Sequence, residues 1–230
     1  NRFEEALVDL VKFQGMPAAR SLEEYDQLDY NLGYCYFKLK DYNNAVSYFK
    51  NVVNSSKLDE ARKTDGYLRL GDSYFVTSSY QLAMKAYDNA SKVNGPERDY
   101  AAFQKTLCSG FLGNNSSKIE GLNDFLTYFL KSSLRDDALF ELGNTYIANN
   151  QESSGLEAYD RLVDEFSRSK FAPRGLLRAG LVHYNASRNQ QALDKLKEVV
   201  EKYPNTQEAK QAVATAKLVY VDEGRVSEYA

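Results

Sequence analysis

The sequence predicts an all-α protein made of antiparallel helix pairs, and the clearest pair lies in residues 29–52. There, apolar residues recur at steps of three and four, which places them on one face of each of two short helices. Neither helix can bury its apolar face alone, so we expect the pair to recur along the chain. The residues of the two faces are Leu32, Gly33 and Tyr36, followed by Ala45, Phe49 and Val52.

The pair does recur, which is the second observation behind the fold class. The segments 67–90, 139–162 and 176–199 carry the same pattern, and two degenerate copies complete the set. One position of the first helix marks each copy at intervals of 34 to 38 residues, a spacing typical of a helical repeat array. We assign this position to Gly33, Gly71, Ser109, Gly143, Gly180 and Lys217.

The prolines supply the third observation. Pro17, Pro96, Pro173 and Pro204 all fall between the predicted helix pairs. Because a proline inside a helix costs about 3 kcal/mol, this placement supports the predicted helix boundaries independently.

A Leu-Gly-x-x-Tyr motif opens three copies, at Leu32, Leu70 and Leu142, and with it the sequence resembles the tetratricopeptide repeat family. That resemblance covers nearly the whole chain and implies a right-handed superhelical solenoid of about five full repeats. The sequence departs from the family pattern at Cys108-Ser109, at Ala179-Gly180 and in having no Trp. The second helices continue the pattern with small residues at Ala45, Ala83, Gly121, Gly155 and Ala192, and with large ones at Phe49, Tyr87, Phe125, Tyr159 and Leu196.

In chain order, we expect a single solenoid over residues 1–230, as a fragment of a longer chain that cuts repeats at both ends. Residues 1–13 carry Phe3, Ala6, Leu10 and Phe13 at helical spacing, as a second helix without its first would. The predicted full repeats span about 26–59, 64–97, 102–135, 136–169 and 173–206, and a partial repeat spans 210–230.

Two residues of the first full repeat predict local geometry. Asp41 lies in the polar turn KLKD, where its carboxylate can cap the free N–H groups of the second helix. Gly33 costs roughly 1 kcal/mol relative to Ala inside a helix, which indicates that a neighbouring helix comes very close there.

Composition excludes several classes of protein. With a formal net charge of −3 and no basic run, the 230-residue chain shows no nucleic-acid footprint. No apolar stretch approaches the roughly 18–20 residues of a membrane span. Cys35 and Cys108 fall in non-adjacent repeats, so we expect buried thiols, not a disulfide.

The sequence contains no recognisable catalytic or metal site, and we predict neither enzyme activity nor a cofactor. The only His, His183, occupies the position that Tyr36, Tyr74 and Tyr146 take in other repeats, so we interpret it as a packing residue. One His and two distant Cys do not provide normal zinc-ligand spacing.

The family resemblance implies that a concave wall of first helices binds a partner protein or peptide. This wall is rich in apolar and aromatic side chains, which would suit an extended or helical hydrophobic peptide. Tyr30 and Tyr34 stand where chaperone-binding relatives carry the Lys and Asn of a carboxylate clamp, so the resemblance excludes that subfamily. Two alternatives stay open: these side chains pack between adjacent first helices, Phe37 and Phe75 above all, or another segment of the same parent protein fills the groove. The predicted wall residues are Tyr30, Tyr34, Phe37, Leu68, Asp72, Phe75, Phe140, Asn144, Leu177, Leu181 and Tyr184.

We therefore predict a non-catalytic protein-binding scaffold; the alternatives are a self-associating structural array or an accessory domain of a larger enzyme or regulator. The last third, including the Tyr203-Pro204 ending, is similar to bacterial envelope repeat proteins such as the barrel-assembly lipoproteins and the Tol–Pal coordinator. This similarity implies a periplasmic or outer-membrane-associated protein with an envelope partner, and a cytoplasmic scaffold is the alternative.

Overall fold

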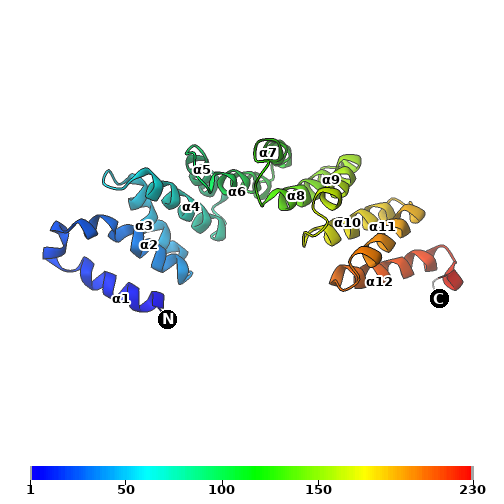
Figure 1. The fold of residues 1–230 in the computed structure, drawn as a ribbon, viewed down its shortest axis with the longest axis horizontal. Coiled ribbons are helices and arrows are strands. Elements are labelled where there is room, and N and C mark those ends of the chain that lie inside the picture. Colours follow the sequence, from blue (N-terminus) through cyan, green and yellow to red (C-terminus); the bar gives the residue numbers. More distant parts are fainter. Residues whose placement is uncertain (1, 229–230) are drawn as a thin grey trace. The chain divides into compact units, whose positions relative to one another are not determined.

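The computed structural model describes residues 2–228, and its regular elements there are all helical, which confirms the predicted all-α class (Figure 1). Three short 3₁₀ turns accompany twelve α-helices within these residues. The α-helices are α1 (Arg2–Gln14), α2 (Leu28–Lys38), α3 (Tyr42–Asn54), α4 (Glu60–Val76), α5 (Tyr80–Ser91), α6 (Arg98–Phe111), α7 (Asn115–Tyr128), α8 (Arg135–Ala148), α9 (Glu152–Glu165), α10 (Ala172–Asn185), α11 (Asn189–Lys202) and α12 (Gln207–Asp222). The 3₁₀ turns are η1 (Pro17–Ser21), η2 (Glu23–Gln27) and η3 (Val226–Glu228).

From α2 onward the helices alternate as pairs, and we call the first helix of each pair the A helix and the second the B helix. The A helices are α2, α4, α6, α8, α10 and α12, and the B helices are α3, α5, α7, α9 and α11. None of the helices within residues 2–228 is both long and apolar enough to cross a membrane.

Every A helix ends in the same turn. In the first pair the Asp41 N–H donates to the Tyr36 carbonyl at 2.9 Å, and the Lys40 N–H donates to the Phe37 carbonyl at 3.0 Å. The same two bonds recur after each A helix, so each one ends in a Schellman motif with its C′ residue at positive φ. These C′ residues recur every 35 to 38 positions, at Lys40, Ser78, Gly113, Asn150, Ser187 and Gly224.

The turns correct the predicted register of the third pair. Counted back seven residues from the positive-φ residue, the marker position is Gly33, Gly71, Gly143 or Gly180 in the other pairs, but it is Thr106 in the third. The prediction of Ser109 is therefore wrong by three residues. A shift of three residues keeps nearly the same helix face, so the apolar pattern alone could not detect the error. In the B helix of this pair, the same correction assigns the small-residue position to Lys118 instead of Gly121. It assigns the large-residue position to Leu122 instead of Phe125.

The marker glycines hold large side chains of their partner B helices, as the position of Gly33 in a helix predicts. A Cβ atom at Gly143 would lie only 2.4 Å from the Tyr159 ring, and one at Gly71 would lie 2.7 Å from the Tyr87 ring. Gly180 faces Leu196 in the same way at 3.0 Å. The third pair reverses the arrangement, because there Gly121 on the B helix faces the Thr106 side chain at 2.6 Å.

Side-chain caps begin several helices. Asp41 accepts a hydrogen bond from the Asn44 N–H at 3.2 Å, which confirms the predicted cap of α3. Asp59 caps α4 through the Arg62 N–H at 2.7 Å, so α4 begins at Glu60. Thr206 caps α12 through the Ala209 N–H at 3.1 Å.

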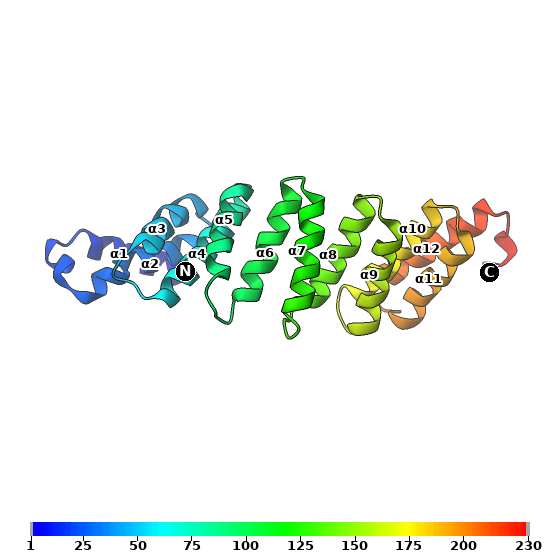
Figure 2. The ribbon, with the colours of Figure 1, turned by 90° about the horizontal axis from the view of Figure 1, so that it is seen from above.

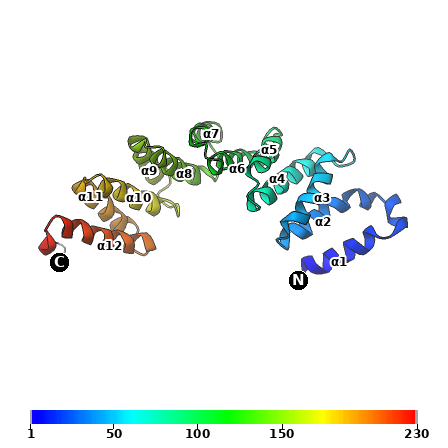
Figure 3. The same cartoon turned by 180° about the vertical axis from the view of Figure 1, so that it is seen from behind.

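The chain divides into two compact units, residues 1–121 and 122–230. In the first, α3, α4, α5 and α6 contribute to a core around Phe49, Tyr87 and Leu68. In the second, α10 and α11 pack together and α12 packs against both (Figure 2 and Figure 3). The core there centres on Leu176 and Leu196. The single solenoid over residues 1–230 stays a prediction. Residues 1, 229 and 230, which that prediction includes, lie outside the described residues.

Candidate protein-binding face of the A helices

The predicted wall residues lie on four A helices: α2 and α4 in the first unit, α8 and α10 in the second. Their surroundings differ between the units, so each unit is described by itself.

In the first unit, Asp65 on α4 binds both tyrosines that were predicted on α2. The Tyr30 hydroxyl donates to Asp65 Oδ2 at 2.9 Å and the Tyr34 hydroxyl donates to the same oxygen at 2.8 Å. Arg69, one turn further along α4, donates from Nε to Asp65 Oδ1 at 3.2 Å and to the Tyr34 hydroxyl at 3.3 Å. The tyrosine hydroxyls are therefore already hydrogen-bonded within the repeat array.

Asp72 is held from three directions. Arg69 Nη1 donates to its Oδ2 at 2.7 Å, while the hydroxyls of Tyr87 and Tyr100 donate to its Oδ1 at 2.8 Å and 2.7 Å. Asp72 is only 8 % exposed and Leu68 only 1 % exposed. These two predicted wall residues therefore lie inside the first unit, where a partner protein would not reach them.

The electrostatics favour the neutral form of both tyrosines and the charged form of Arg69. Burial, followed by the hydrogen bond to Asp65, raises the pKa of both Tyr30 and Tyr34. Burial disfavours the charge on Arg69, but the carboxylates of Asp72 and Asp65 outweigh it and raise the pKa of the guanidinium above its ordinary value. Neutral tyrosines and a charged arginine thus share two carboxylates, the arrangement that a buried ion pair needs in order to be stable.

Phe37 and Phe75 pack against side chains of neighbouring A helices, which was one of the two alternatives to a binding wall. Phe75 meets Phe111 of the next A helix edge-to-face at 5.2 Å, and Arg69 lies over the Phe37 ring at 6.0 Å. Both rings are half-buried.

In the second unit, Phe140 on α8 forms an aromatic and cationic stack. Its ring lies 5.2 Å from the Phe171 ring, and the Arg178 guanidinium lies over it at 5.8 Å. Arg178 is exposed and makes no ion pair with any carboxylate in residues 2–228. An arginine stacked on a ring in this way presents its N–H donors to the solvent.

Asn144 lies one turn beyond Phe140 on α8. The Tyr159 hydroxyl donates to Asn144 Oδ1 at 2.8 Å, which orients the side-chain amide so that its NH₂ group faces away from that bond. Burial raises the pKa of Tyr159 to about 12, so this hydroxyl stays a donor at neutral pH.

On α10, Leu177 is 7 % exposed and Leu181 is half-buried. The Tyr184 hydroxyl donates to Asp222 Oδ2 at the end of α12. Leu177 therefore belongs to the core, whereas Leu181, three residues beyond Arg178 on α10, is only partly buried.

Sequence reasoning included Asp72 but missed the other charged members of the two clusters, Asp65, Arg69 and Arg178. Asp65, Arg69 and Asp72 occur at steps of four and three on one helix, a spacing that puts them on one face and could have revealed the network. Arg178 occupies the same repeat position as Arg69, nine residues before the positive-φ residue of its turn.

The groups able to do chemistry are held in structural contacts. Arg188 Nε donates to His183 Nδ1 at 3.0 Å, and burial, with Arg188 and Lys195 nearby, lowers the pKa of His183. Cys35 and Cys108 are buried free thiols, and burial raises the pKa of Cys108 to about 12. Among the described residues no three His, Cys, Asp or Glu side chains gather in a way that could hold a metal ion.

Comparison with known proteins agrees with this architecture. Family models of the tetratricopeptide repeat match residues 30–57, 137–169 and 174–206. These three segments are tetratricopeptide repeats. Repeats of this type form scaffolds that bind other proteins. No curated protein sequence matches the chain.

Solved structures share the repeat fold at low sequence identity. A tetratricopeptide repeat protein from Parabacteroides merdae ATCC 43184 is 13% identical, with a TM-score of 0.67 over 90% of this chain and 76% of that one. MamA from Desulfovibrio magneticus RS-1 is 17% identical, with a TM-score of 0.64 over 79% of this chain and 97% of that one. YrrB, a repeat protein with an unusual peptide-binding site, is 12% identical, with a TM-score of 0.59 over 80% of this chain and 90% of that one.

Proposed function

We propose that this protein is a non-catalytic scaffold that holds an extended segment of a partner protein on the A helices of its second unit. The observation that carries the proposal is Arg178, exposed over Phe140 without a carboxylate partner among residues 2–228. Its counterpart Arg69 is fully engaged by Asp65 and Asp72. A cation that the fold does not neutralise is available to an acidic ligand.

The neighbouring groups define the ligand further. Leu181, three residues from Arg178 on the same helix, supplies apolar contact, and the Asn144 NH₂ group supplies donors for a backbone carbonyl. We therefore propose a partner segment with an Asp or Glu next to an apolar residue. YrrB, which shares the fold, has a peptide-binding site, and this likeness favours a peptide ligand.

Selection from a displayed library of random peptides tests this function. We expect enriched sequences that pair an acidic with an apolar residue, and we expect Arg178→Ala to weaken their binding at least about 10-fold, as loss of a charged anchor does. Lys85→Ala removes an exposed cation from α5 of the first unit and serves as the matched control. Enriched peptides that bind Arg178→Ala and the parent protein equally would overturn the proposal.

We also propose a periplasmic or outer-membrane-associated location, on the resemblance of the last third of the sequence to bacterial envelope repeat proteins. Fractionation of cells that express the natural gene tests it. Recovery with the envelope fractions is the expected result, and recovery with the cytosol would contradict it.

A further inference from the structure

The second unit contains a pocket of about 660 Å³ with an excess of positive charge, which we call the basic pocket. It lies between the turn that leads into α10 and the turn that leads into α12. Four cationic side chains and a single carboxylate line it, together with several hydroxyl groups. The charged residues are Arg168, Lys170, Arg174, Lys202 and Glu208, and the hydroxyl groups belong to Ser167, Ser169, Tyr203 and Thr206.

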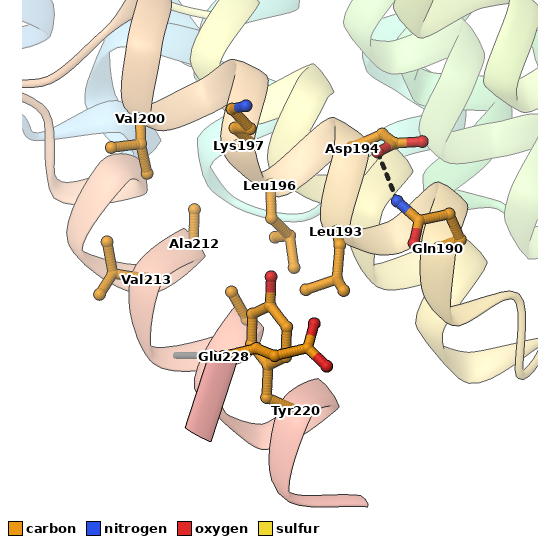
Figure 4. Close-up of a pocket in the computed structure, with 11 residues that line it drawn as sticks. Gln190, Leu193, Asp194, Leu196, Lys197, Val200, Ala212, Val213, Tyr220 and Glu228 are labelled. Carbon is orange, nitrogen blue, oxygen red and sulfur yellow. Dashed lines mark hydrogen bonds between the residues drawn. The ribbon is translucent and has the colours of Figure 1, made fainter. Parts of the chain in front are cut away.

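Two other pockets of the same unit have the opposite charge balance. The pocket of about 420 Å³ between α11 and α12 is lined by Lys197 together with Asp194 and Glu228 (Figure 4). A pocket of about 400 Å³ between the turns that lead into α8 and α10 is lined by one cation, Arg168, and two carboxylates. The positive excess is therefore a property of the basic pocket and not of the unit as a whole.

The 400 Å³ pocket is the counterpart of the basic pocket one repeat earlier. The positive-φ residues that follow α8 and α10 lie 37 positions apart, and α9 and α11 also end 37 positions apart. With this shift, three lining positions change their charge between the two pockets, and each change removes a negative charge, adds a positive one, or does both. The pairs are Ser133 and Lys170, Asp136 and Pro173, and Glu165 and Lys202.

The acidic groups of the earlier pocket have partners within the protein. Asp136 Oδ2 accepts a hydrogen bond from the Ser169 hydroxyl at 2.6 Å, and Glu165 Oε2 lies 3.3 Å from Arg135 Nη2. Because Asp136 and Glu165 have no acidic counterparts one repeat later, the basic pocket lacks these internal carboxylates. Its cations must therefore find their counter-charge elsewhere.

Two of the cations are not neutralised by the described part of the chain. Arg168 and Lys170 are exposed, and neither forms an ion pair with a carboxylate within residues 2–228. Lys170 Nζ lies over the Phe171 ring at 4.8 Å, and the Arg174 guanidinium lies over the same ring at 5.8 Å. The ring thus brings two cationic groups to one side of the pocket.

The other two cations are paired only at the surface. Arg174 Nε lies 3.2 Å from Glu208 Oε1, and Lys202 Nζ lies 2.5 Å from Glu198 Oε1 on its own helix. Both cationic side chains are 51% exposed, and exposed pairs of this kind contribute roughly 0–1 kcal/mol. Each cation also has further N–H donors that these pairs do not use.

We propose that the basic pocket binds a phosphomonoester group, carried by a small molecule or by a lipid headgroup. Such a group has about −1.5 to −2 charges at pH 7 on three acceptor oxygens, which suits several cations and hydroxyl donors better than the single charge of a carboxylate does. The pocket volume lies within the roughly 300–1,000 Å³ of small-molecule sites. The proposal uses neither Arg178 nor Asn144, so it stands independently of peptide binding on the A helices.

Isothermal titration calorimetry with glycerol 3-phosphate tests the site, and glycerate, which has a carboxylate in place of the phosphate, is the matched ligand. We expect glycerol 3-phosphate to bind with a Kd below about 1 mM and at least about 10-fold more tightly than glycerate. Flotation with phosphatidylcholine vesicles, with and without phosphatidic acid, shows whether a lipid can present the same group. Absence of binding both to glycerol 3-phosphate and to phosphatidic acid vesicles would overturn the proposal.

A double variant gives the basic pocket the residues of its counterpart. Lys170→Ser with Lys202→Glu should weaken binding of the phosphomonoester at least about 10-fold while circular dichroism stays unchanged. Lys197→Ser with Lys210→Glu makes the same change in net charge outside the pocket and should retain binding. Equal losses in the two double variants, or binding that survives the first, would overturn the site.

Arg178→Ala separates this proposal from the peptide-binding function. It should leave the affinity for glycerol 3-phosphate unchanged, although it weakens binding of the selected acidic peptides. Loss of glycerol 3-phosphate binding in Arg178→Ala would place the anion on the A-helix face and would contradict the assignment to the basic pocket.

Discussion

Arg69 and Arg178 occupy the same repeat position, one in each unit, yet they have opposite surroundings. Arg69 lies between Asp65 and Asp72, which also receive four tyrosine hydroxyls. At the positions equivalent to those two aspartates, the repeat of Arg178 has Arg174 and Leu181. The comparison teaches that the neighbours on the same helix decide whether a repeat arginine stabilises the fold or remains available to a partner.

The largest expected effect separates the two arginines. Arg69→Met leaves Asp65 and Asp72 without their cation in a largely buried site, so we expect a loss of about 3–5 kcal/mol in the free energy of unfolding. Arg178→Met removes an exposed group that has no ion pair, so we expect a change within about 0.5 kcal/mol. Urea denaturation followed by circular dichroism measures both, and equal losses would break the comparison.

The marker glycines give the next largest effect. Gly143→Ala forces a Cβ atom against the buried Tyr159 ring, so we expect a loss of about 1–3 kcal/mol despite the better helix propensity of Ala. Gly95→Ala is the control, because a Cβ atom there has nothing within 4 Å. The same denaturation experiment decides, and a neutral Gly143→Ala would show that α8 and α9 have room between them.

Two tyrosine-to-phenylalanine changes sharpen the comparison at smaller scale. Tyr34→Phe removes a hydrogen bond to the half-buried Asp65, and we expect it to cost about 1 kcal/mol of stability. Tyr184→Phe removes an exposed bond to Asp222 and should change stability by less than about 0.5 kcal/mol. A larger loss of stability for Tyr184→Phe than for Tyr34→Phe would show that a polar network stabilises the second unit as well.

The smallest effect concerns pH and His183. Its pKa in the folded protein lies below the usual 6.5, so the unfolded chain binds a proton that the native protein resists. The contribution of neutral His183 to the free energy of unfolding is therefore complete above pH 6.5. It declines as the pH falls from 6.5 toward the pKa of His183 in the folded protein. His183→Gln should show a weaker decline of stability with falling pH than the parent protein. Identical profiles from pH 8 to pH 5 would contradict this role.

Sequence reasoning predicted the helix pairs, the cap at Asp41 and the close approach at Gly33, because each depends on residues a few positions apart. It misplaced the third pair by three residues, since only the backbone turn at Gly113 fixes that register. It listed Leu68, Asp72, Phe140 and Leu177 as wall residues, and they are buried. Repeat position alone does not specify burial, which depends on the side chains of the neighbouring helices.

The most direct test of the difference between the two units is the exchange of arginine side-chain Nε–H protons with water, observed by NMR at neutral pH. The Arg69 Nε–H, bonded to Asp65 and to the Tyr34 hydroxyl, should exchange slowly and give a distinct signal. The Arg178 Nε–H should exchange fast and become protected only when a partner peptide binds. A protected Arg178 signal in the free protein, or an Arg69 signal that exchanges as fast as that of Arg178, would contradict this account.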